Sequence, residues 1–347
     1  MLGSTAADAS AGTRPLDAPL RQTLAETLTR PVWVLFVALA VPFALGVSVP
    51  DAVAYAPLVA SAALFGMPHG AVDHVAAART AGVGVLRGLA AVTVLYVAAG
   101  GAYLGLWFVA PVVAAVFFVA LTWFHWGQGD VYFLLAITGE RPRTRARRAL
   151  ALVVRGGLPM IVPLVAFPGT YRAVVGEWAA LFGADLATVA PLFGEARLLL
   201  GGALGALTLL SLALGAGDPG WGVDAIELVV LWAFFLVVPP VLAVGLYFCL
   251  WHSPRHVARV MALDERTAGA LREVDLGRAL ARFGRAAAPL TILALVLIVA
   301  GAALVPNPPE TLSGWVGLYL VGIAVLTLPH AVVVTWMDDR QGVWTAS

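Results

Sequence analysis

Nine long apolar runs divide the sequence, and this pattern constrains the fold more than any other feature. A helix needs roughly 20 mainly apolar residues to cross the hydrocarbon core of a bilayer, and most of the runs approach that length. Charged residues make up only 12% of the 347-residue chain, about half the share typical of soluble domains. Backbone groups in lipid must bond to one another, which helices achieve internally. We therefore expect an all-α polytopic membrane helix bundle with about eight or nine spans, multi-pass in the cell membrane. The runs lie near residues 31–49, 52–68, 86–107, 111–137, 149–167, 193–215, 225–252, 287–305 and 314–336.

The segments outside these runs suggest one membrane domain with a polar start. Residues 1–28 are expected to form a disordered polar N-terminal arm, and residues 29–340 a single transmembrane domain. The arginine-rich segment 255–285 predicts an amphipathic interfacial helix, and 173–190 is a candidate for another.

The distribution of arginine predicts the orientation of the protein in the membrane for all but one basic segment. Basic loops tend to lie on the cytoplasmic side of a membrane, which places the N-terminal arm and the loops 79–87 and 139–148 on that side. The segment 255–285 conflicts with this arrangement. Three predicted spans separate it from residue 148, and an odd number of crossings would leave it on the opposite side.

Several classes of function lack support in the sequence. The net charge of +1 gives no field that would attract nucleic acid, so we expect no nucleic-acid partner. No phosphate-binding loop, dinucleotide-binding glycine motif or nucleophile elbow is present. The single cysteine, Cys249, can form neither an intrachain disulfide nor a cysteine-ligated iron–sulfur cluster. All 21 basic residues are arginine, so no lysine is available for Schiff-base chemistry.

Six histidines lie within or beside the apolar runs: His69, His74, His125, His252, His256 and His330. Ionisable groups at membrane depth are costly and usually functional. His252 and His256 are four residues apart, which places both rings on one face of a helix, although Pro254 lies between them. Imidazole without thiolate suits iron, copper, zinc or nickel. The distribution therefore predicts a metal site whose ion the residues alone do not choose.

Two carboxylates follow histidines closely. Asp73 comes four residues after His69, and Asp130 five residues after His125. A carboxylate in such a position can accept a hydrogen bond from the far nitrogen of a ligating imidazole. The alternative for each is a helix cap or an ion pair.

Four histidine motifs resemble, in order, those of the Brp/Blh family of membrane β-carotene 15,15′-dioxygenases. They are PHG…DH at 68–74, FHWG at 124–127, HSPRH at 252–256 and LPH at 328–330. The resemblance implies a catalytic Fe(II) held by four histidines, which by motif are His69, His125, His252 and His256. It places His74 and His330 near the site but off the metal. One departure is Gln128, where the family often has an acidic residue.

The activity implied by the resemblance is cleavage of the central double bond of β-carotene by O₂, giving two molecules of retinal. Such a substrate is dissolved in membrane lipid and would enter an apolar tunnel between helices. The candidate tunnel walls are aromatic: Trp123, Phe124, Trp126, Tyr247, Phe248 and Trp251. A chain without lysine cannot hold retinal as a Schiff base, so the product would pass to another protein, for which a rhodopsin is the expected partner.

Two alternatives from other classes remain open on the sequence. One is a membrane electron-transfer protein with a bis-histidine haem. The other is a transporter whose intramembrane histidines and aspartates carry protons or a metal ion, although no inverted repeat is evident.

Overall fold

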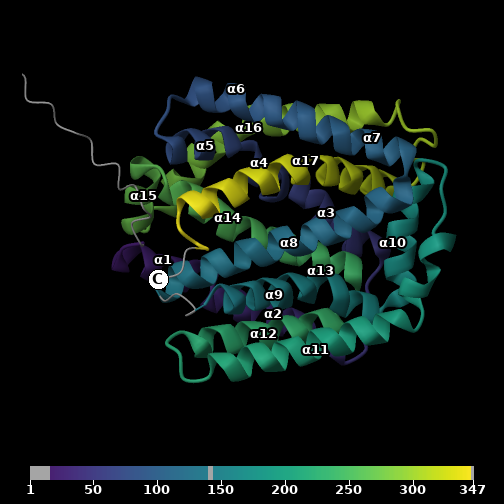
Figure 1. The fold of residues 1–347 in the computed structure, drawn as a ribbon, viewed down its shortest axis with the longest axis horizontal. Coiled ribbons are helices and arrows are strands. Elements are labelled where there is room, and N and C mark those ends of the chain that lie inside the picture. Colours follow the sequence, from purple (N-terminus) through teal and green to yellow (C-terminus); the bar gives the residue numbers. More distant parts are fainter. Residues whose placement is uncertain (1–15, 140–143, 345–347) are drawn as a thin grey trace, which may run out of the picture.

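The computed structural model describes residues 16–139 and 144–344, and within these ranges it consists of helices joined by short connections without any strand. The fold prediction of an all-α polytopic bundle is confirmed (Figure 1). The helices are α1 (Ala18–Leu28), α2 (Arg30–Ala44), α3 (Asp51–Ala63), α4 (Gly66–Ala71), α5 (Asp73–Ala81), α6 (Val85–Leu95), η1 (Tyr96–Gly100), α7 (Gly101–Val109), α8 (Pro111–Thr138), α9 (Arg145–Ala166), α10 (Pro168–Ala180), η2 (Ala187–Phe193), α11 (Ala196–Gly215), α12 (Trp221–Val237), α13 (Pro240–Tyr247), η3 (Phe248–His252), α14 (Ser253–Ala262), α15 (Glu265–Arg272), α16 (Leu276–Gly301) and α17 (Leu312–Arg340).

Eight helical stretches of the described chain are long and apolar enough to cross a membrane, which makes this a multi-pass membrane protein. The two most buried of them are Arg145–Ala166 and Leu312–Arg340, whereas in five others fewer than half of the residues in the most apolar part are buried. Exposed Val, Leu and Phe side chains on the outer helices fit contact with lipid rather than water. The other six stretches are Ala18–Ala44, Asp51–Ala81, Val85–Val109, Pro111–Thr138, Ala196–Gly215 and Leu276–Gly301.

The predicted single span 225–252 is wrong, because the chain reverses direction inside it. Helix α12 ends at Val237, and α13 begins at Pro240. Between them Val238 has an extended backbone, with ψ of 131°. A residue before proline avoids the helical region, and proline has no N–H for the helical ladder. The helix that follows runs back through the centre of the bundle as α13, η3 and α14 (Figure 1).

This reversal removes the conflict over the orientation of the arginine-rich segments. Four helical passes, rather than three, now lie between residue 148 and the segment 255–285: α9, α11, α12 and the continuous helix α13–α14. The basic segments accordingly meet at one end of the bundle, and the positive-inside rule predicts that this end is cytoplasmic. Ion pairs connect the segments there: Arg79–Asp264 at 2.8 Å, Arg272–Asp17 at 2.7 Å and Arg147–Asp218 at 2.5 Å.

The prediction of a disordered arm over residues 1–28 needs correction from Ala18 onward. Residues Ala18–Leu28 form helix α1, whose first turn contains Pro19 and is capped by the Asp17 side chain, which accepts a hydrogen bond from the Leu20 N–H. The Arg272 guanidinium and the Leu20 N–H both stabilise the charged carboxylate and lower the pKa of Asp17. Residues 1–15 lie outside the described chain.

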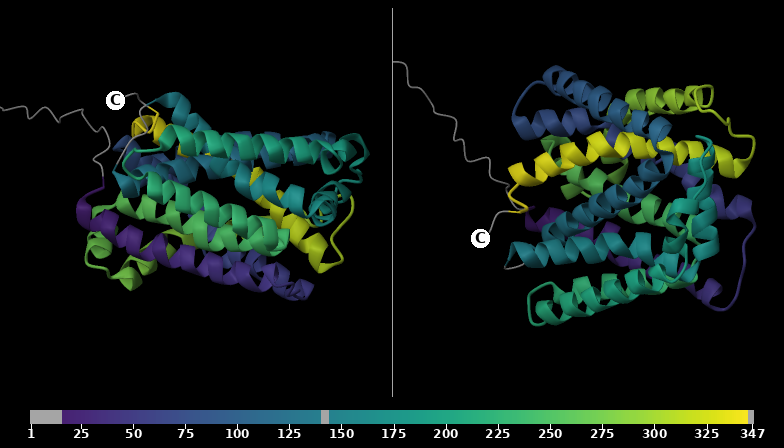
Figure 2. Two further views of the ribbon diagram at one scale, coloured as in Figure 1. Left: turned by 90° about the horizontal axis from the view of Figure 1, so that it is seen from below. Right: turned by 45° about the vertical axis from the view of Figure 1, so that its right-hand side comes forward.

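The segment 255–285 is not one interfacial helix. Helix α14 ends at Ala262, α15 occupies Glu265–Arg272, and α16 begins at Leu276. Asp264 and Asp275 cap the starts of α15 and α16 with their side chains, which divides the segment at two positions. The segment 173–190 is helical over most of its first half, where α10 stands across the opposite end of the bundle (Figure 2).

Glycines allow α8 and α9 to pack closely. A Cβ atom added at Gly156 would lie 1.9 Å from the Trp123 carbonyl oxygen, and one added at Gly127 would lie 2.2 Å from the Leu152 carbonyl oxygen. Small residues of this kind bring membrane helices into backbone contact. Because α8 also carries His125, this contact sets the depth of that side chain in the bundle.

We predict that Gly156→Ala destabilises the protein by about 1–3 kcal/mol, the usual cost of overpacking. The added methyl group must push α8 away from α9, since the nearest atoms belong to backbone. The measurement is the thermal unfolding midpoint in detergent, with Gly205→Ala as the control, because nothing lies within 4 Å of a Cβ at Gly205. Equal midpoints for the two variants would contradict the packing argument.

The topology predicts the sidedness of single cysteines introduced into a Cys249→Ser background. A cysteine at Asp264 should react with a membrane-impermeant thiol reagent from the same side as one at Asp218. A cysteine at Glu310, beyond α16, should react from the other side. Labelling of Asp218 and Asp264 positions from opposite sides would show that α12 and α13 do not form two separate passes.

Candidate metal centre

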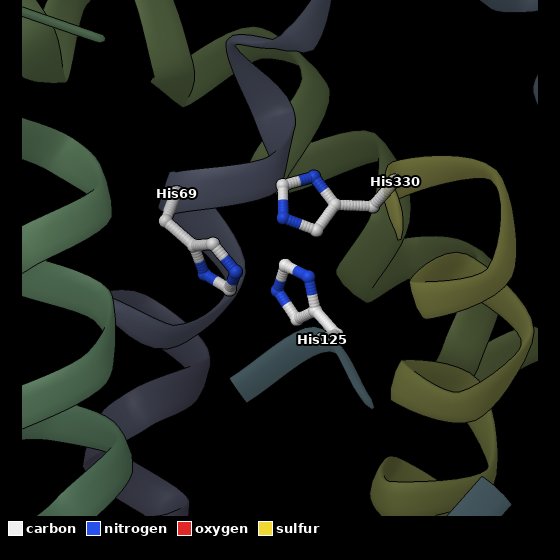
Figure 3. A group of neighbouring side chains, drawn as sticks. All are labelled: His69, His125 and His330. Atoms are coloured by element: carbon white, nitrogen blue, oxygen red, sulfur yellow. The ribbon is translucent and has the colours of Figure 1, made fainter. Parts of the chain in front are cut away.

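Five of the six histidines meet at the centre of the bundle. His69 comes from α4, His125 from α8, His252 from the end of η3, His256 from α14 and His330 from α17. All five side chains are buried. The rings of His69, His125 and His330 turn toward a common point (Figure 3). The structure therefore brings the four predicted ligands together and adds His330 to them.

The distances between the rings are short. The centroid of the His330 ring lies 4.7 Å from that of His125, 4.9 Å from that of His69 and 5.0 Å from that of His256. The His125 and His252 Nε2 atoms are 3.2 Å apart. Ligand-capable atoms of His69, His125 and His330 all lie within 4.8 Å of one another, and so do those of Asp73, His256 and His330.

Hydrogen bonds on the outer side of the cluster fix the nitrogen that faces inward on two of the rings. The Nδ1–H of His69 donates to the Gly66 carbonyl, and the Nδ1–H of His330 donates to the Asp73 carboxylate. The oxygen partners can only accept, so each Nε2 carries a free lone pair. Within the described residues, Nε2 of His256 and of His330 are buried without a hydrogen-bond partner.

This donor set fits an iron ion. Buried nitrogen atoms without partners are costly in an apolar environment, and a bound metal would satisfy them. Neutral imidazoles from several helices are ligands that Fe(II) accepts, as do other transition metals. The residues that could hold the ion are the five clustered histidines, with Asp73 available beside His330.

The structure shows where the other predicted site residues lie. His330, predicted to lie near the site but off the metal, is central to the cluster. His74 is only half-buried, its Nδ1 bonds the Ala71 carbonyl, and its ring makes none of the histidine contacts. Asp73 pairs with His330 rather than with His69. Gln128 donates to the Thr335 hydroxyl at 3.1 Å. The LPH motif was the available signal for His330, but its spacing alone could not show which way the ring points.

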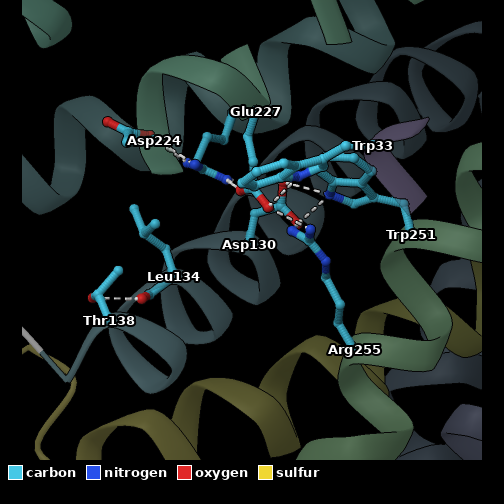
Figure 4. A network of polar contacts seen from close by, with 9 residues as sticks. Trp33, Asp130, Leu134, Thr138, Asp224, Glu227, Trp251 and Arg255 are labelled. Atoms are coloured by element: carbon cyan, nitrogen blue, oxygen red, sulfur yellow. Dashed lines mark hydrogen bonds and ion pairs between the residues drawn. The ribbon is translucent and has the colours of Figure 1, made fainter. Parts of the chain in front are cut away.

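Among the described residues, Asp130 forms no hydrogen bond with a histidine, and it belongs to a buried network of charges (Figure 4). It accepts hydrogen bonds from the Trp251 indole, at 3.0 Å, and from Arg255 and Arg155. The Glu227 carboxylate bridges the same two arginines, at 2.5 Å from Arg255 and 2.7 Å from Arg155. Buried charges are tolerated only where such partners satisfy them. Of the two interpretations that the sequence left open for Asp130, the structure shows the ion pair.

The network fixes the rotation of the helix that carries two of the histidines. The Arg255 guanidinium lies over the Trp251 ring at 3.9 Å and over the Phe133 ring at 4.5 Å. Both Arg255 and Trp251 directly precede a histidine, so their contacts hold one face of η3 and α14 against α8 and α12. The neighbouring face then presents His252 and His256 to the cluster.

A cavity adjoins the histidines. His69, His125 and His330 line it, and the remainder of its wall is largely aliphatic and aromatic, with Trp126 and Phe248 among the wall residues. Tyr171 and Trp178 of α10 also line it, so the cavity extends toward the end of the bundle that α10 covers. An apolar wall with a few polar groups gathered at one place is typical of pockets for organic ligands.

Two of the expected tunnel aromatics have other roles. Trp123 donates its indole N–H to the Val153 carbonyl at 2.7 Å and belongs to the contact between α8 and α9. Trp251 is fully buried against Asp130. Neither side chain lines the cavity, and neither do Phe124 and Tyr247, so the tunnel prediction is corrected for four of the six aromatic residues.

Fold and site together define a class: a polytopic membrane protein with a buried centre of imidazoles that faces an apolar cavity. The family model described as "Beta-carotene 15,15'-dioxygenase" matches residues 60–338. The chain therefore belongs to the β-carotene 15,15′-dioxygenase family, which confirms the Brp/Blh resemblance and the prediction of an oxidoreductase of the carotenoid-cleaving class.

Two relatives from Halobacterium salinarum show the extent of the similarity. The chain is 52% identical over 338 residues to "Probable beta-carotene 15,15'-dioxygenase Blh", covering 95% of this chain and 97% of the relative. It is 34% identical over 331 residues to "Probable beta-carotene 15,15'-dioxygenase Brp", covering 89% and 90%. No solved structure matches the chain.

We predict that Glu227→Ala destabilises the protein by about 3–5 kcal/mol, because it leaves two buried guanidinium groups short of a partner. The control is Glu273→Ala, whose ion pair with Arg278 is exposed and 3.5 Å long, so its loss should cost less than about 1 kcal/mol. Unfolding midpoints in detergent make the comparison. Similar midpoints for the two variants would show that the buried network does not stabilise the bundle.

Proposed function

We propose that this protein is an iron-dependent enzyme that cleaves β-carotene at its central 15,15′ double bond with O₂ and releases two molecules of retinal. One observation carries the proposal: a cluster of buried imidazoles forms part of the wall of an apolar cavity inside a membrane bundle. Membership of the family and the names of the two relatives support the same substrate.

The reaction has three requirements: a bound iron ion, a dry apolar site for the polyene, and a fixed position of the polyene beside the metal. Residues of the chain account for each of them. When bound, iron supplies the ability to activate O₂. His69, His125, His252 and His256, the ligands implied by the motifs, hold it as uncharged donors. The cavity wall excludes water and binds a polyene by apolar contact alone. Trp126 and Phe248, which line the cavity and contact the histidine cluster, would position the polyene beside the metal.

The surroundings of the protein follow from the same chemistry. β-Carotene is dissolved in lipid, and the exposed apolar faces of the outer helices place the protein in that lipid, which we take to be the cell membrane. The chain has no lysine with which to retain retinal. We therefore propose that the product passes to a separate retinal-binding protein such as a rhodopsin.

The haem alternative is not favoured by the crowding of the cluster. A bis-histidine haem needs a flat macrocycle between two imidazoles. Here His125 and His252 are 3.2 Å apart at Nε2, and three more rings surround them. No observation specifically favours the transporter.

The direct test is expression in cells that make β-carotene. The wild-type protein should bleach the orange colour and produce retinal, measured by chromatography, and growth with an iron chelator should suppress this. His125→Ala should lower retinal formation by at least 100-fold at equal membrane insertion, because it removes a proposed ligand. His74→Ala, outside the cluster, should have a much smaller effect.

Purified, iron-loaded protein that leaves β-carotene intact under O₂ would overturn the proposal. A Soret absorption band in the purified protein would favour the haem alternative instead.

A further inference from the structure

His330 occupies a special position among the clustered histidines. It is the residue that belongs to both groups of ligand-capable atoms, one with His69 and His125 and the other with Asp73 and His256. Its ring contacts three other imidazoles at centroid distances of 4.7 to 5.0 Å. A metal ion placed among the other histidines would therefore lie within reach of His330 as well.

Two oxygen atoms fix the ring of His330 from behind. Its Nδ1–H lies 2.8 and 2.9 Å from the two oxygens of the Asp73 carboxylate. The Tyr96 hydroxyl donates to the same carboxylate at 2.6 Å. The three side chains come from three separate elements: α17, α5 and η1. Asp73 is buried, so this chain of hydrogen bonds is shielded from competing water.

The other ring nitrogen of His330 has no such partner in the described part of the chain. The Nε2 atom of His330 is buried, and no described residue gives it a hydrogen bond. Gly70 lies against the ring, where an added Cβ would be 3.6 Å from Nδ1, so the ring is also packed against α4. A histidine held by a carboxylate at one nitrogen and presenting a lone pair at the other is the usual arrangement of a metal ligand.

We propose that His330 is itself a ligand of the metal through Nε2, and that Asp73 and Tyr96 are positioning residues that orient it. The inference rests on the proposed function for the identity of the metal, but it concerns a ligand beyond the four implied by the sequence motifs. It also gives Asp73 a role different from the one its spacing to His69 suggested.

The test is metal binding by the purified full-length protein in detergent, with Co(II) as a probe that has a visible ligand-field spectrum. His330→Asn should weaken Co(II) binding at least tenfold and change the spectrum, because an imidazole is lost from the ion. Asp73→Asn should weaken it about 10- to 100-fold, the usual effect of removing the partner of a ligating histidine. Tyr96→Phe should weaken it less, because the carboxylate remains.

His74→Asn is the matched control, since it makes the same substitution at a histidine outside the cluster, and it should bind Co(II) like the wild-type protein. Wild-type affinity and spectrum in His330→Asn would overturn the proposal. If His330→Asn does not fold, as shown by its unfolding midpoint, the other two variants decide: unchanged affinity in both Asp73→Asn and Tyr96→Phe overturns it.

The assay uses no carotenoid, so its failure differs from failure of the proposed function. Wild-type protein that binds Co(II) and, when loaded with iron, leaves β-carotene intact contradicts the proposed function but not the role of His330. Wild-type protein that cleaves β-carotene while His330→Asn keeps wild-type metal binding contradicts only the role of His330.

Discussion

The structure depends on one constraint: polar groups inside a lipid-embedded bundle must satisfy one another, because no water is present to do so. The chain meets this constraint with two polar clusters, the charge network and the histidine cluster, that share the helices α8 and α14. In the network, two guanidinium groups are shared among the carboxylates of Asp130, Asp224 and Glu227. Its contacts fix how α8, α9, α12 and α14 face one another. That arrangement of helices in turn determines the geometry of the histidine cluster.

The two clusters differ in what they leave unsatisfied. Most donors of Arg155 and the carboxylate oxygens of Glu227 have partners within the network, although the Nε of Arg255 is buried without one. By contrast, imidazole nitrogens of His256 and His330 have none among the described residues. In a membrane protein the first condition stabilises a fold, and the second indicates a binding site, since an unpaired buried polar atom is otherwise selected against.

Much of the architecture and part of the site could be predicted from the sequence. Long apolar runs predicted the bundle, and the histidine motifs predicted four side chains that do meet. The run 225–252 gave the wrong topology because its apolar character is continuous across a reversal of direction, and only Pro239 and Pro240 marked the break. The partners of Asp73 and Asp130 could not be predicted from spacing. Each pairs with groups that are far away in the sequence, His330 in one case and Arg155, Trp251 and Arg255 in the other.

Three of the five clustered histidines lie beside irregularities in the helices that carry them. His69 follows the break between α3 and α4, His252 ends the π-helical turn η3, and His330 follows Pro329 within α17. Tyr96, which holds Asp73, begins the other π-helical turn. A π-helical turn or a proline alters the direction in which the next side chains point, and such features are frequent at functional sites. His125 reaches the cluster from the regular helix α8, whereas His69, His252 and His330 reach it from beside irregular turns. The local cost of these irregularities is best explained by the centre that the histidines form together.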